Sequence, residues 1–149
     1  GIGMARNALL DACRGEYVWF IDADDKLMPQ ALSQLHSVVR TSRPDLVLCD
    51  FRVWRERTRL KHVLRGELHR HTFQGPGAQL RSDPAELLSG MLLGGQMHPW
   101  SKIARHELWT DLRFPVASCF EDMAVIPRLA LRASSLFLCP SAVAGVPPA

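Results

Sequence analysis

The chain has 149 residues, of which 47% are hydrophobic and 22% are charged, and its formal net charge is +3. These values are typical of one globular domain and exclude a disordered chain. No apolar run approaches the ~20 residues of a membrane-spanning helix, and no signal peptide is visible. Cys13, Cys49, Cys119 and Cys139 form no C-x-x-C pair, so we expect reduced thiols, most of them in the core of a cytoplasmic protein.

The first third of the chain predicts helix, strand, helix and strand in succession. Apolar spacing predicts a helix over residues 4–13, capped at Gly15, and an apolar run predicts a buried strand over 17–21. A helical stripe over 29–40 and a buried strand over 45–51 follow. Short connections make this a βαβ unit, in which the two strands run parallel with a right-handed crossover.

The pattern becomes less regular after residue 51. Residues 52–72 are expected to extend the second strand or to form a hairpin, and Asp83 followed by Pro84 predicts a helix start. That helix should end near residue 93.

The last third predicts short elements. We expect a short helix over 106–112, a helix over 126–133 with Pro127 in its first turn, and a short strand over 136–139. Two strong parallel strands are too few for a stable sheet, so the missing part of the sheet is expected to precede the first residue.

These elements predict a single incomplete domain over residues 1–149. It divides into a βαβ segment over 1–51, a variable region over 52–98, a further segment over 99–140, and a tail over 141–149 that is expected to fray.

Basic residues concentrate between positions 52 and 70, where seven lysines and arginines stand against two acids. A solvated strand and loop is the favoured interpretation, and attraction to a phosphorylated acceptor or an anionic membrane is the alternative. Nucleic-acid binding is not expected, because there is no helical basic stripe and no aromatic platform. The basic residues are Arg52, Arg55, Arg57, Arg59, Lys61, Arg65 and Arg70.

His62, His69 and His71 are interpreted as surface residues, because no carboxylate partner accompanies them.

Three carboxylates crowd the carboxyl end of the first predicted strand, those of Asp22, Asp24 and Asp25. Open α/β sheets bind their ligands at this end of the strands. Carboxylates this close repel one another unless a positive charge lies between them. Because Mg²⁺ commonly takes one or two protein carboxylates together with phosphate oxygens, the turn predicts a divalent cation bound with a phosphorylated substrate.

Other chemistries use parts of this pattern. Phosphotransferases of the haloacid dehalogenase type have Thr or Val where Lys26 stands, and there the first aspartate, here Asp22, would attack phosphorus. An EF-hand calcium loop needs glycine where Leu27 stands. A helix cap would account for one carboxylate, not three. The phosphotransferase stays open as an alternative, as does an inactive chain that acts as an interaction surface.

The stretch 3–25 resembles the family 2 glycosyltransferases, whose pattern here is A-R-N, about eight residues, G-x-Y, an apolar triplet and D-x-D-D. W-S-K at 100–102 resembles the W-x-K segment of that family, and F-E-D at 120–122 resembles its E-D segment. The order and the approximate spacing both fit, and the resemblance covers residues 1 to about 139.

The resemblance implies an α/β fold, a partial GT-A (Rossmann-like) fold with a mixed or parallel sheet flanked by helices. The first βαβ part of the nucleotide-binding region, with its P-x-Y-N and D-D-G-S strands, is missing, and P-S-A at 140–142 stands where Y-x-Y-R is usual. Because of these departures, we expect the isolated chain neither to bind donor tightly nor to turn over.

The implied activity is inverting transfer of a sugar from a nucleotide-sugar, usually a UDP-sugar, to an acceptor hydroxyl, with Mg²⁺ or Mn²⁺. A saccharide or lipid-linked saccharide is the implied acceptor. The implied setting is surface polysaccharide synthesis in the cytoplasm, with peripheral contact at the inner face of the membrane.

The family pattern also implies roles for single residues. Asp22 and Asp24 would bind the metal, while Arg6, Asp22 and Asp25 would contact the donor.

On the acceptor side, Asp122 would be the general base, with Glu121 beside it, although both would also suit a helix amino end. Trp100 and Lys102 would contact substrate. Packing is the alternative for Trp100, and a surface charge is the alternative for Lys102.

Overall fold

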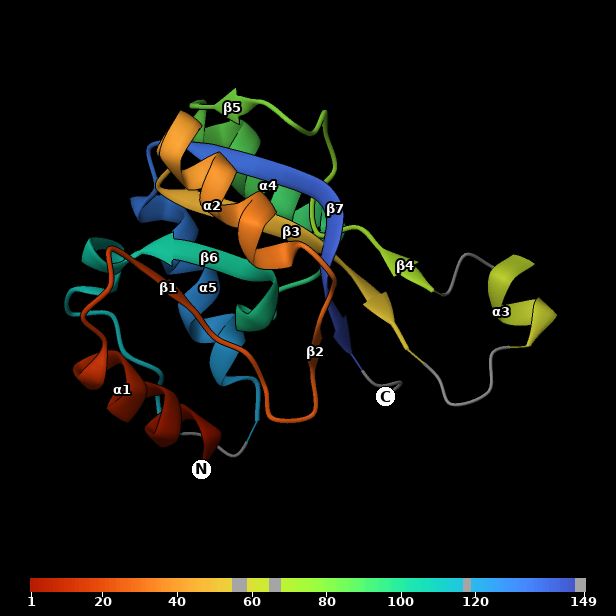
Figure 1. Ribbon diagram of the computed structural model, residues 1–149. Helices are drawn as coiled ribbons and strands as arrows, with labels where there is room; N and C mark the ends of the chain where they lie inside the picture. Colours follow the sequence, from red (N-terminus) through yellow and green to blue (C-terminus); the bar gives the residue numbers. More distant parts are fainter. Residues whose placement is uncertain (55–58, 65–67, 117–118, 147–149) are drawn as a thin grey trace.

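The computed structural model describes residues 1–54, 59–64, 68–116 and 119–146, with the side chains of 61–62 and 140–143 left out (Figure 1). The described chain forms a curled mixed sheet flanked by helices, as predicted. The strands are β1 (Tyr17–Trp19), β2 (Lys26–Leu27), β3 (Leu46–Val53), β4 (His69–Arg70), β5 (Leu80–Arg81), β6 (Lys102–Arg105) and β7 (Leu136–Val146). The helices are α1 (Ile2–Ala12), α2 (Ala31–Ser42), α3 (Leu60–Leu64), α4 (Pro84–Gly94) and α5 (Glu121–Arg132), with 3₁₀ turns η1 (Pro99–Ser101) and η2 (His106–Trp109).

The strand order β1-β6-β3-β7-β2 shows how distant segments complete the sheet. β6 pairs antiparallel with both β1 and β3, so β1 and β3 are parallel to each other, as predicted, but they are not neighbours. β7 pairs parallel with β3. The last third of the chain therefore supplies both neighbours of the central strand β3, which the local pattern of the βαβ unit could not reveal.

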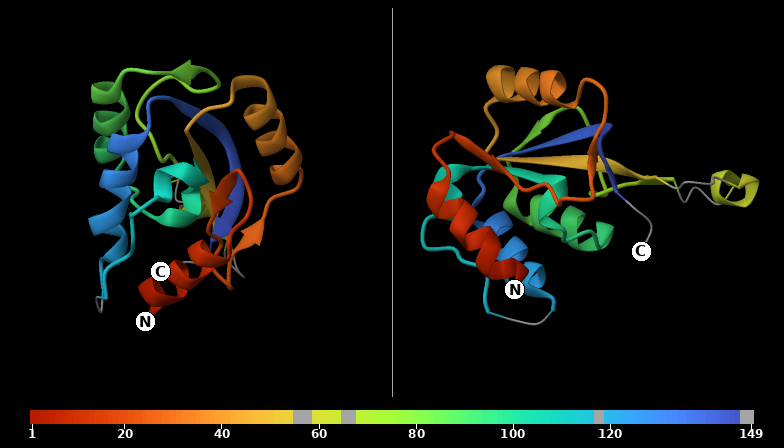
Figure 2. Two further views of the ribbon diagram at one scale, coloured as in Figure 1. Left: turned by 90° about the vertical axis from the view of Figure 1, so that its left-hand side faces the viewer. Right: turned by 60° about the horizontal axis from the view of Figure 1, so that its bottom comes forward.

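Helices cover both faces of the sheet, with α2 on one face and α1, α4 and α5 on the other (Figure 2). Successive residues of β3 serve opposite faces because side chains alternate along a strand. Val47 and Cys49 pack in the cluster that includes Ala31 and Leu35 of α2. Leu46 and Leu48 pack in the larger cluster of the other face, with side chains of α1, α4 and α5.

Several predicted boundaries were wrong. Helix α1 ends at Ala12 and its C-cap residue, Cys13, is extended, so Gly15 is not its cap. Helix α5 begins at Glu121, which places Pro127 inside the helix rather than in its first turn. β7 runs to Val146 and pairs with β3 and β2, so residues 141–146 of the expected frayed tail are part of the sheet. Backbone pairing with β3 overrides the weak local pattern there. Residues 147–149 lie outside the described part.

No disulfide joins the four cysteines, as expected, but they are not mostly in the core. Cys49 and Cys139 are buried, whereas Cys13 is half-buried and Cys119 is exposed. Within the part of the chain that is described, no helix has the length and apolar character needed to cross a membrane.

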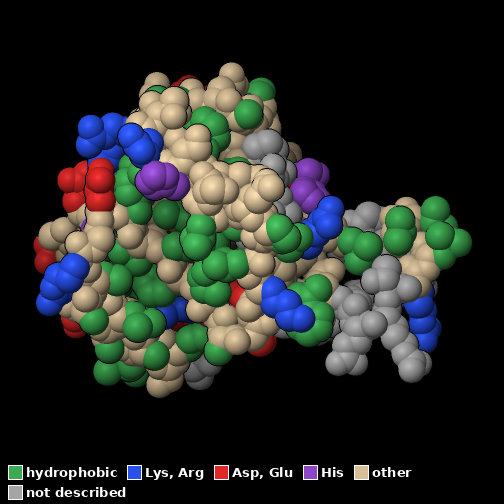
Figure 3. Space-filling view, in the orientation of Figure 1, with side chains coloured by type: hydrophobic (Ala, Val, Ile, Leu, Met, Phe, Trp, Pro, Cys, Tyr) green, Lys and Arg blue, Asp and Glu red, His purple; other side chains and the backbone are tan. Residues whose placement is uncertain are grey.

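The basic stretch is solvated where the structure describes it. Arg52, Arg59 and Arg70 are exposed, and on the face drawn in Figure 3 the lysines and arginines lie in separate small groups. Arg55, Arg57 and Arg65 lie outside the described residues, as does the side chain of Lys61.

Candidate functional site

Three segments that are far apart in sequence meet at the side chain of Arg6 on α1. Its Nη1 donates to Glu121 Oε1 at 3.0 Å, and its Nη2 donates to Asp22 Oδ1 at 3.3 Å. The arginine is only 6% exposed, so these two carboxylates compensate the cost of burying its charge. Arg6, Asp22 and Glu121, here called the Arg6 cluster, thus join the A-R-N, D-x-D-D and E-D segments in one place.

Helix α1 is fixed in this position by two neighbours of Arg6. The Asn7 side chain accepts from the Phe114 backbone N–H and donates to the Phe114 carbonyl, both at 2.9 Å. A Cβ on Gly3 would lie 2.9 Å from the Pro115 carbonyl oxygen, so glycine permits the close approach. The prediction from sequence gave Asn7 no role, although its place beside Arg6 in the family pattern was a signal that it matters.

The acidic turn carries Asp22, Asp24 and Asp25 between β1 and β2. The Asp25 N–H donates to the Asp22 carbonyl at 3.1 Å, and the Asp22 N–H donates to Asp25 Oδ2 at 3.3 Å. Burial, aided by the charges of Asp22 and Asp24, raises the pKa of Asp25 to about 6, against the hydrogen bond from Asp22. The turn therefore gathers negative charge that its own hydrogen bonds do not balance.

Asp24 has the carboxylate most available to a ligand. It is exposed, and no hydrogen bond or ion pair from any described residue reaches its side chain. The turn holds no group of three carboxylates with ligand atoms within 4.8 Å, as far as the chain is described, so it offers a cation at most two such ligands. Two carboxylates with the rest supplied by phosphate and water suit Mg²⁺ or Mn²⁺.

Asp122 lies at the amino end of α5, next to Glu121. Its Oδ1 accepts from the Met123 N–H at 2.9 Å, and its Oδ2 lies 3.7 Å from His98 Nδ1. The His98 ring stacks on Trp100, with centroids 4.9 Å apart and planes 9° from parallel. Burial, followed by the charge of Lys102, lowers the pKa of His98. A neutral imidazole beside the Asp122 carboxylate is a site feature that the sequence prediction missed.

The position of Lys102 contradicts one of the two interpretations that the sequence left open. It is 2% exposed, so it is not a surface charge, and its ammonium makes its contacts inside the protein. Its Nζ donates to the carbonyls of Gln96 and His98 at 2.5 and 2.9 Å, and to Ser101 Oγ at 2.9 Å. Lys102 thus holds the backbone that carries His98.

Trp100 is a packing residue in this structure. It is nearly buried and meets Phe51 edge to face, with ring centroids 4.4 Å apart. Its carbonyl accepts from Trp19 Nε1 at 2.7 Å, which ties η1 to β1. His98, whose ring stacks on Trp100, is half-exposed and is the solvent-facing ring of the three.

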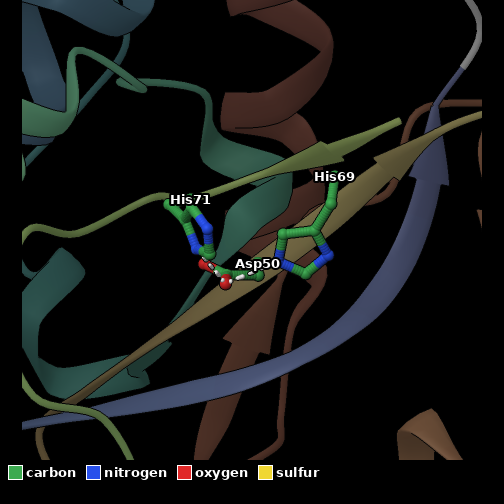
Figure 4. Close-up of side chains that lie close together, drawn as sticks. All are labelled: Asp50, His69 and His71. Carbon is green, nitrogen blue, oxygen red and sulfur yellow. Dashed lines mark hydrogen bonds and ion pairs between the residues drawn. The ribbon is translucent and has the colours of Figure 1, made fainter. Parts of the chain in front are cut away.

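The prediction that His69 and His71 lack a carboxylate partner was wrong. Asp50 on β3 lies within hydrogen-bonding distance of both rings (Figure 4). The sequence hid this contact because Asp50 precedes the two histidines by 19 and 21 residues. The side chain of His62 lies outside the described part.

The sequence profile described as "Glycosyl transferase family 2" matches residues 1–130 of the chain. "Putative glycosyltransferase EpsH" from Bacillus subtilis (strain 168) is 40% identical over 53 residues, which is 34% of this chain and 14% of EpsH.

Solved structures of S. aureus TarS show the same fold. TarS 1–349 superposes with a TM-score of 0.76 at 20% identity, over 99% of this chain and 40% of its own length. The same protein in complex with UDP-GlcNAc gives a TM-score of 0.75 at 20% identity, covering 99% of this chain and 39% of its own. Its complex with UDP gives a TM-score of 0.75 at 21% identity, covering 100% of this chain and 40% of its own. The chain thus spans well under half of these relatives, and its fold corresponds to part of theirs.

Proposed function

Because the chain belongs to glycosyl transferase family 2, we propose that it contributes the metal-binding turn and the general base to the transfer of a sugar from a nucleotide-sugar to an acceptor hydroxyl. The observation that carries the proposal is the Arg6 cluster. One guanidinium joins the acidic turn, at Asp22, to the start of α5, at Glu121. Donor-side and acceptor-side carboxylates are thereby held in a fixed relation.

A UDP-sugar is the donor that we propose. The TarS complexes with UDP-GlcNAc and UDP support this choice, since the shared fold supplies the same framework. Asp22 and Asp24 would hold Mg²⁺ or Mn²⁺, and Asp25 would approach the donor sugar. The ion would supply Lewis-acid stabilisation of the charge that develops on the departing diphosphate.

Arg6 has a positioning role in this proposal rather than a direct contact with the nucleotide. Its guanidinium is already used by Asp22 and Glu121, in two ion pairs. It aims one oxygen of Asp22 inward and leaves the remaining oxygen for a ligand. Removing it would leave two acids without their cation.

Asp122 is the general base that we propose, in preference to Glu121. The Glu121 carboxylate is bound to Arg6, whereas Asp122 Oδ2 has His98 as its near neighbour, at 3.7 Å. Asp122 would accept the proton of the acceptor hydroxyl as its oxygen attacks the anomeric carbon opposite the leaving diphosphate. Such an in-line attack inverts the configuration of that carbon.

The wider setting is also proposed. We place the activity in surface polysaccharide synthesis, on a saccharide or lipid-linked saccharide acceptor, in the cytoplasm near the inner face of the membrane. The likeness to EpsH supports transfer of a glycosyl group, and four cysteines without a disulfide fit a reducing compartment. A phosphotransferase reaction at Asp22 gains no support, because its inner oxygen is engaged by Arg6.

Calorimetry of UDP binding to the full-length protein, with and without Mn²⁺, tests the proposal. Asp24→Ala should weaken Mn²⁺-dependent binding at least tenfold, which is about 1.4 kcal/mol. Asp11→Asn, which alters an exposed carboxylate on α1, is the matched control and should bind as the wild type does. Equal affinity in Asp24→Ala and wild type would overturn the metal assignment. A beryllofluoride adduct on Asp22 would instead favour the phosphotransferase.

A further inference from the structure

A second group of ligand-type side chains lies where β4 joins β3 (Figure 4). Asp50, His69 and His71, here called the Asp50 cluster, each bring one ligand atom within 4.8 Å of the other two. We propose that this cluster binds a divalent transition-metal ion of the Zn²⁺ type through Asp50 Oδ2, His69 Nε2 and His71 Nδ1. The proposal concerns residues outside the Arg6 cluster and does not rest on the proposed glycosyl transfer.

Strand pairing brings the three ligands to one face. In the antiparallel pair of β3 with β4, Phe51 lies opposite Arg70 and Arg52 lies opposite His69. Continuing this register by one residue sets His71 opposite Asp50. Because side chains alternate along a strand, His69 and His71 share a face, and Asp50 shares it with them. The H-x-H spacing is therefore the spacing that a two-histidine site on a strand needs.

The Asp50 carboxylate is prepared as a ligand. It is 1% exposed, and its Oδ1 accepts from the Thr72 backbone N–H at 3.1 Å. That contact fixes the carboxylate plane and leaves Oδ2 directed at His69 Nε2 and His71 Nδ1, at 2.9 and 2.8 Å. Outer contacts of this kind orient ligands in established metal sites.

The two imidazoles can accept an ion without disturbing the fold. The side chains of His69 and His71 are 37% and 74% exposed, so solvent reaches both rings. His69 also lines a cavity of about 430 Å³. With an ion about 2.0–2.2 Å from each ligand atom, the ligand atoms would lie about 3.3 Å from one another. Reaching this separation is a small movement for exposed rings. Solvent could then fill the remaining coordination positions.

Hydrogen bonding alone is the competing explanation. Two imidazole N–H groups could both donate to Asp50 Oδ2 and hold β4 against β3 without any metal. The ligand chemistry favours the ion, since two imidazoles and one carboxylate form a donor set that suits Zn²⁺ and its neighbours in the first transition row. The two explanations differ in what removing one histidine does to metal binding.

The test is Zn²⁺ titration of the EDTA-treated full-length protein against a chromophoric chelator, with Cys119→Ser in every sample to remove an exposed thiol. We expect one ion per chain, and visible absorption bands when Co²⁺ is used as the probe. His71→Ala and His69→Ala should each weaken binding at least about tenfold. Zn²⁺ should raise the Tm of the wild type and leave that of His71→Ala unchanged.

Two variants make the result specific. His36→Ala removes an exposed histidine on α2, and Asp24→Ala removes the proposed donor-side ligand; both should bind Zn²⁺ as the wild type does. Circular dichroism of His71→Ala establishes that it folds, which its exposed side chain favours. Undiminished Zn²⁺ binding by folded His71→Ala, or no binding by the folded wild type, would overturn the proposal. Because Mn²⁺-dependent UDP binding is measured separately, failure of either proposal leaves the other standing.

Discussion

The Arg6 cluster and the Asp50 cluster are both built around buried charge, yet only one could be recognised along the chain. The Arg6 cluster uses residues that lie within motifs, and each motif carries its own signal. The Asp50 cluster uses an aspartate in the middle of an apolar strand and two histidines in an irregular segment. A site whose residues lie in recognisable motifs, such as the Arg6 cluster, can be predicted from local sequence. A site that forms only through strand register, such as the Asp50 cluster, cannot.

Arg6→Met should produce the largest loss of stability. It leaves Asp22 and Glu121 without their shared cation, and removing one partner of a buried ion pair costs about 3–5 kcal/mol. Urea denaturation measures the free energy of unfolding. Arg113→Met, which breaks an exposed pair with Asp11, should cost less than about 1 kcal/mol. Similar losses in the two variants would show that the Arg6 cluster does not hold its segments together.

The pH dependence of stability tests the interior position of Lys102. Burial lowers the pKa of its ammonium from 10.5 to about 7 in the folded chain. Between these two pKa values the unfolded chain binds more protons than the folded chain. The free energy of unfolding therefore increases as the pH is raised from about 7 to about 10.5, by up to about 1.4 kcal/mol per pH unit.

Lys102→Met should remove this contribution, whereas Lys26→Met, on an exposed side chain, should keep it. Denaturation midpoints at about pH 7 and about pH 9 give the comparison. A wild-type slope that persists in Lys102→Met would assign the pH dependence to another group.

Asn7→Ala tests how α1 presents Arg6. The substitution removes both hydrogen bonds to the Phe114 backbone and leaves those groups partly unsatisfied, which should cost about 1–3 kcal/mol. Ser33→Ala removes an exposed hydroxyl contact on α2 and should change stability little. If the two variants unfold at the same urea concentration, α1 is not anchored through Asn7.

Asp83→Ala is expected to have the smallest effect, and it tests a feature that was predicted entirely from local sequence. Asp83 Oδ1 accepts from the Ala85 N–H at 2.9 Å and caps α4. Loss of such a cap costs about 1 kcal/mol, measured by thermal or urea unfolding. Ser82→Ala is the neighbouring control, and a loss as small as that of the control would mean that the cap is replaced by solvent.

The sequence indicated the motif-borne part of the site and missed what supports it. Asp22, Asp24, Glu121 and Asp122 were singled out because carboxylates at a strand end or helix start have a recognisable chemistry. The interior position of Lys102 could not be predicted, because its three acceptors are supplied by a loop that folds around it. His98 was missed because a lone histidine before a proline carries no pattern.

The amino-acid sequence by itself determined the elements whose signal is local: the helical stripes of α1 and α2, the apolar strands β1 and β3, and the Asp83–Pro84 start of α4. Tertiary structure decided that β6 lies between β1 and β3 and that β7 continues to Val146. The reason is that backbone hydrogen bonding between strands depends little on which side chains they carry. Register therefore follows from how whole layers pack, and Asp50 meets His69 and His71 as a consequence.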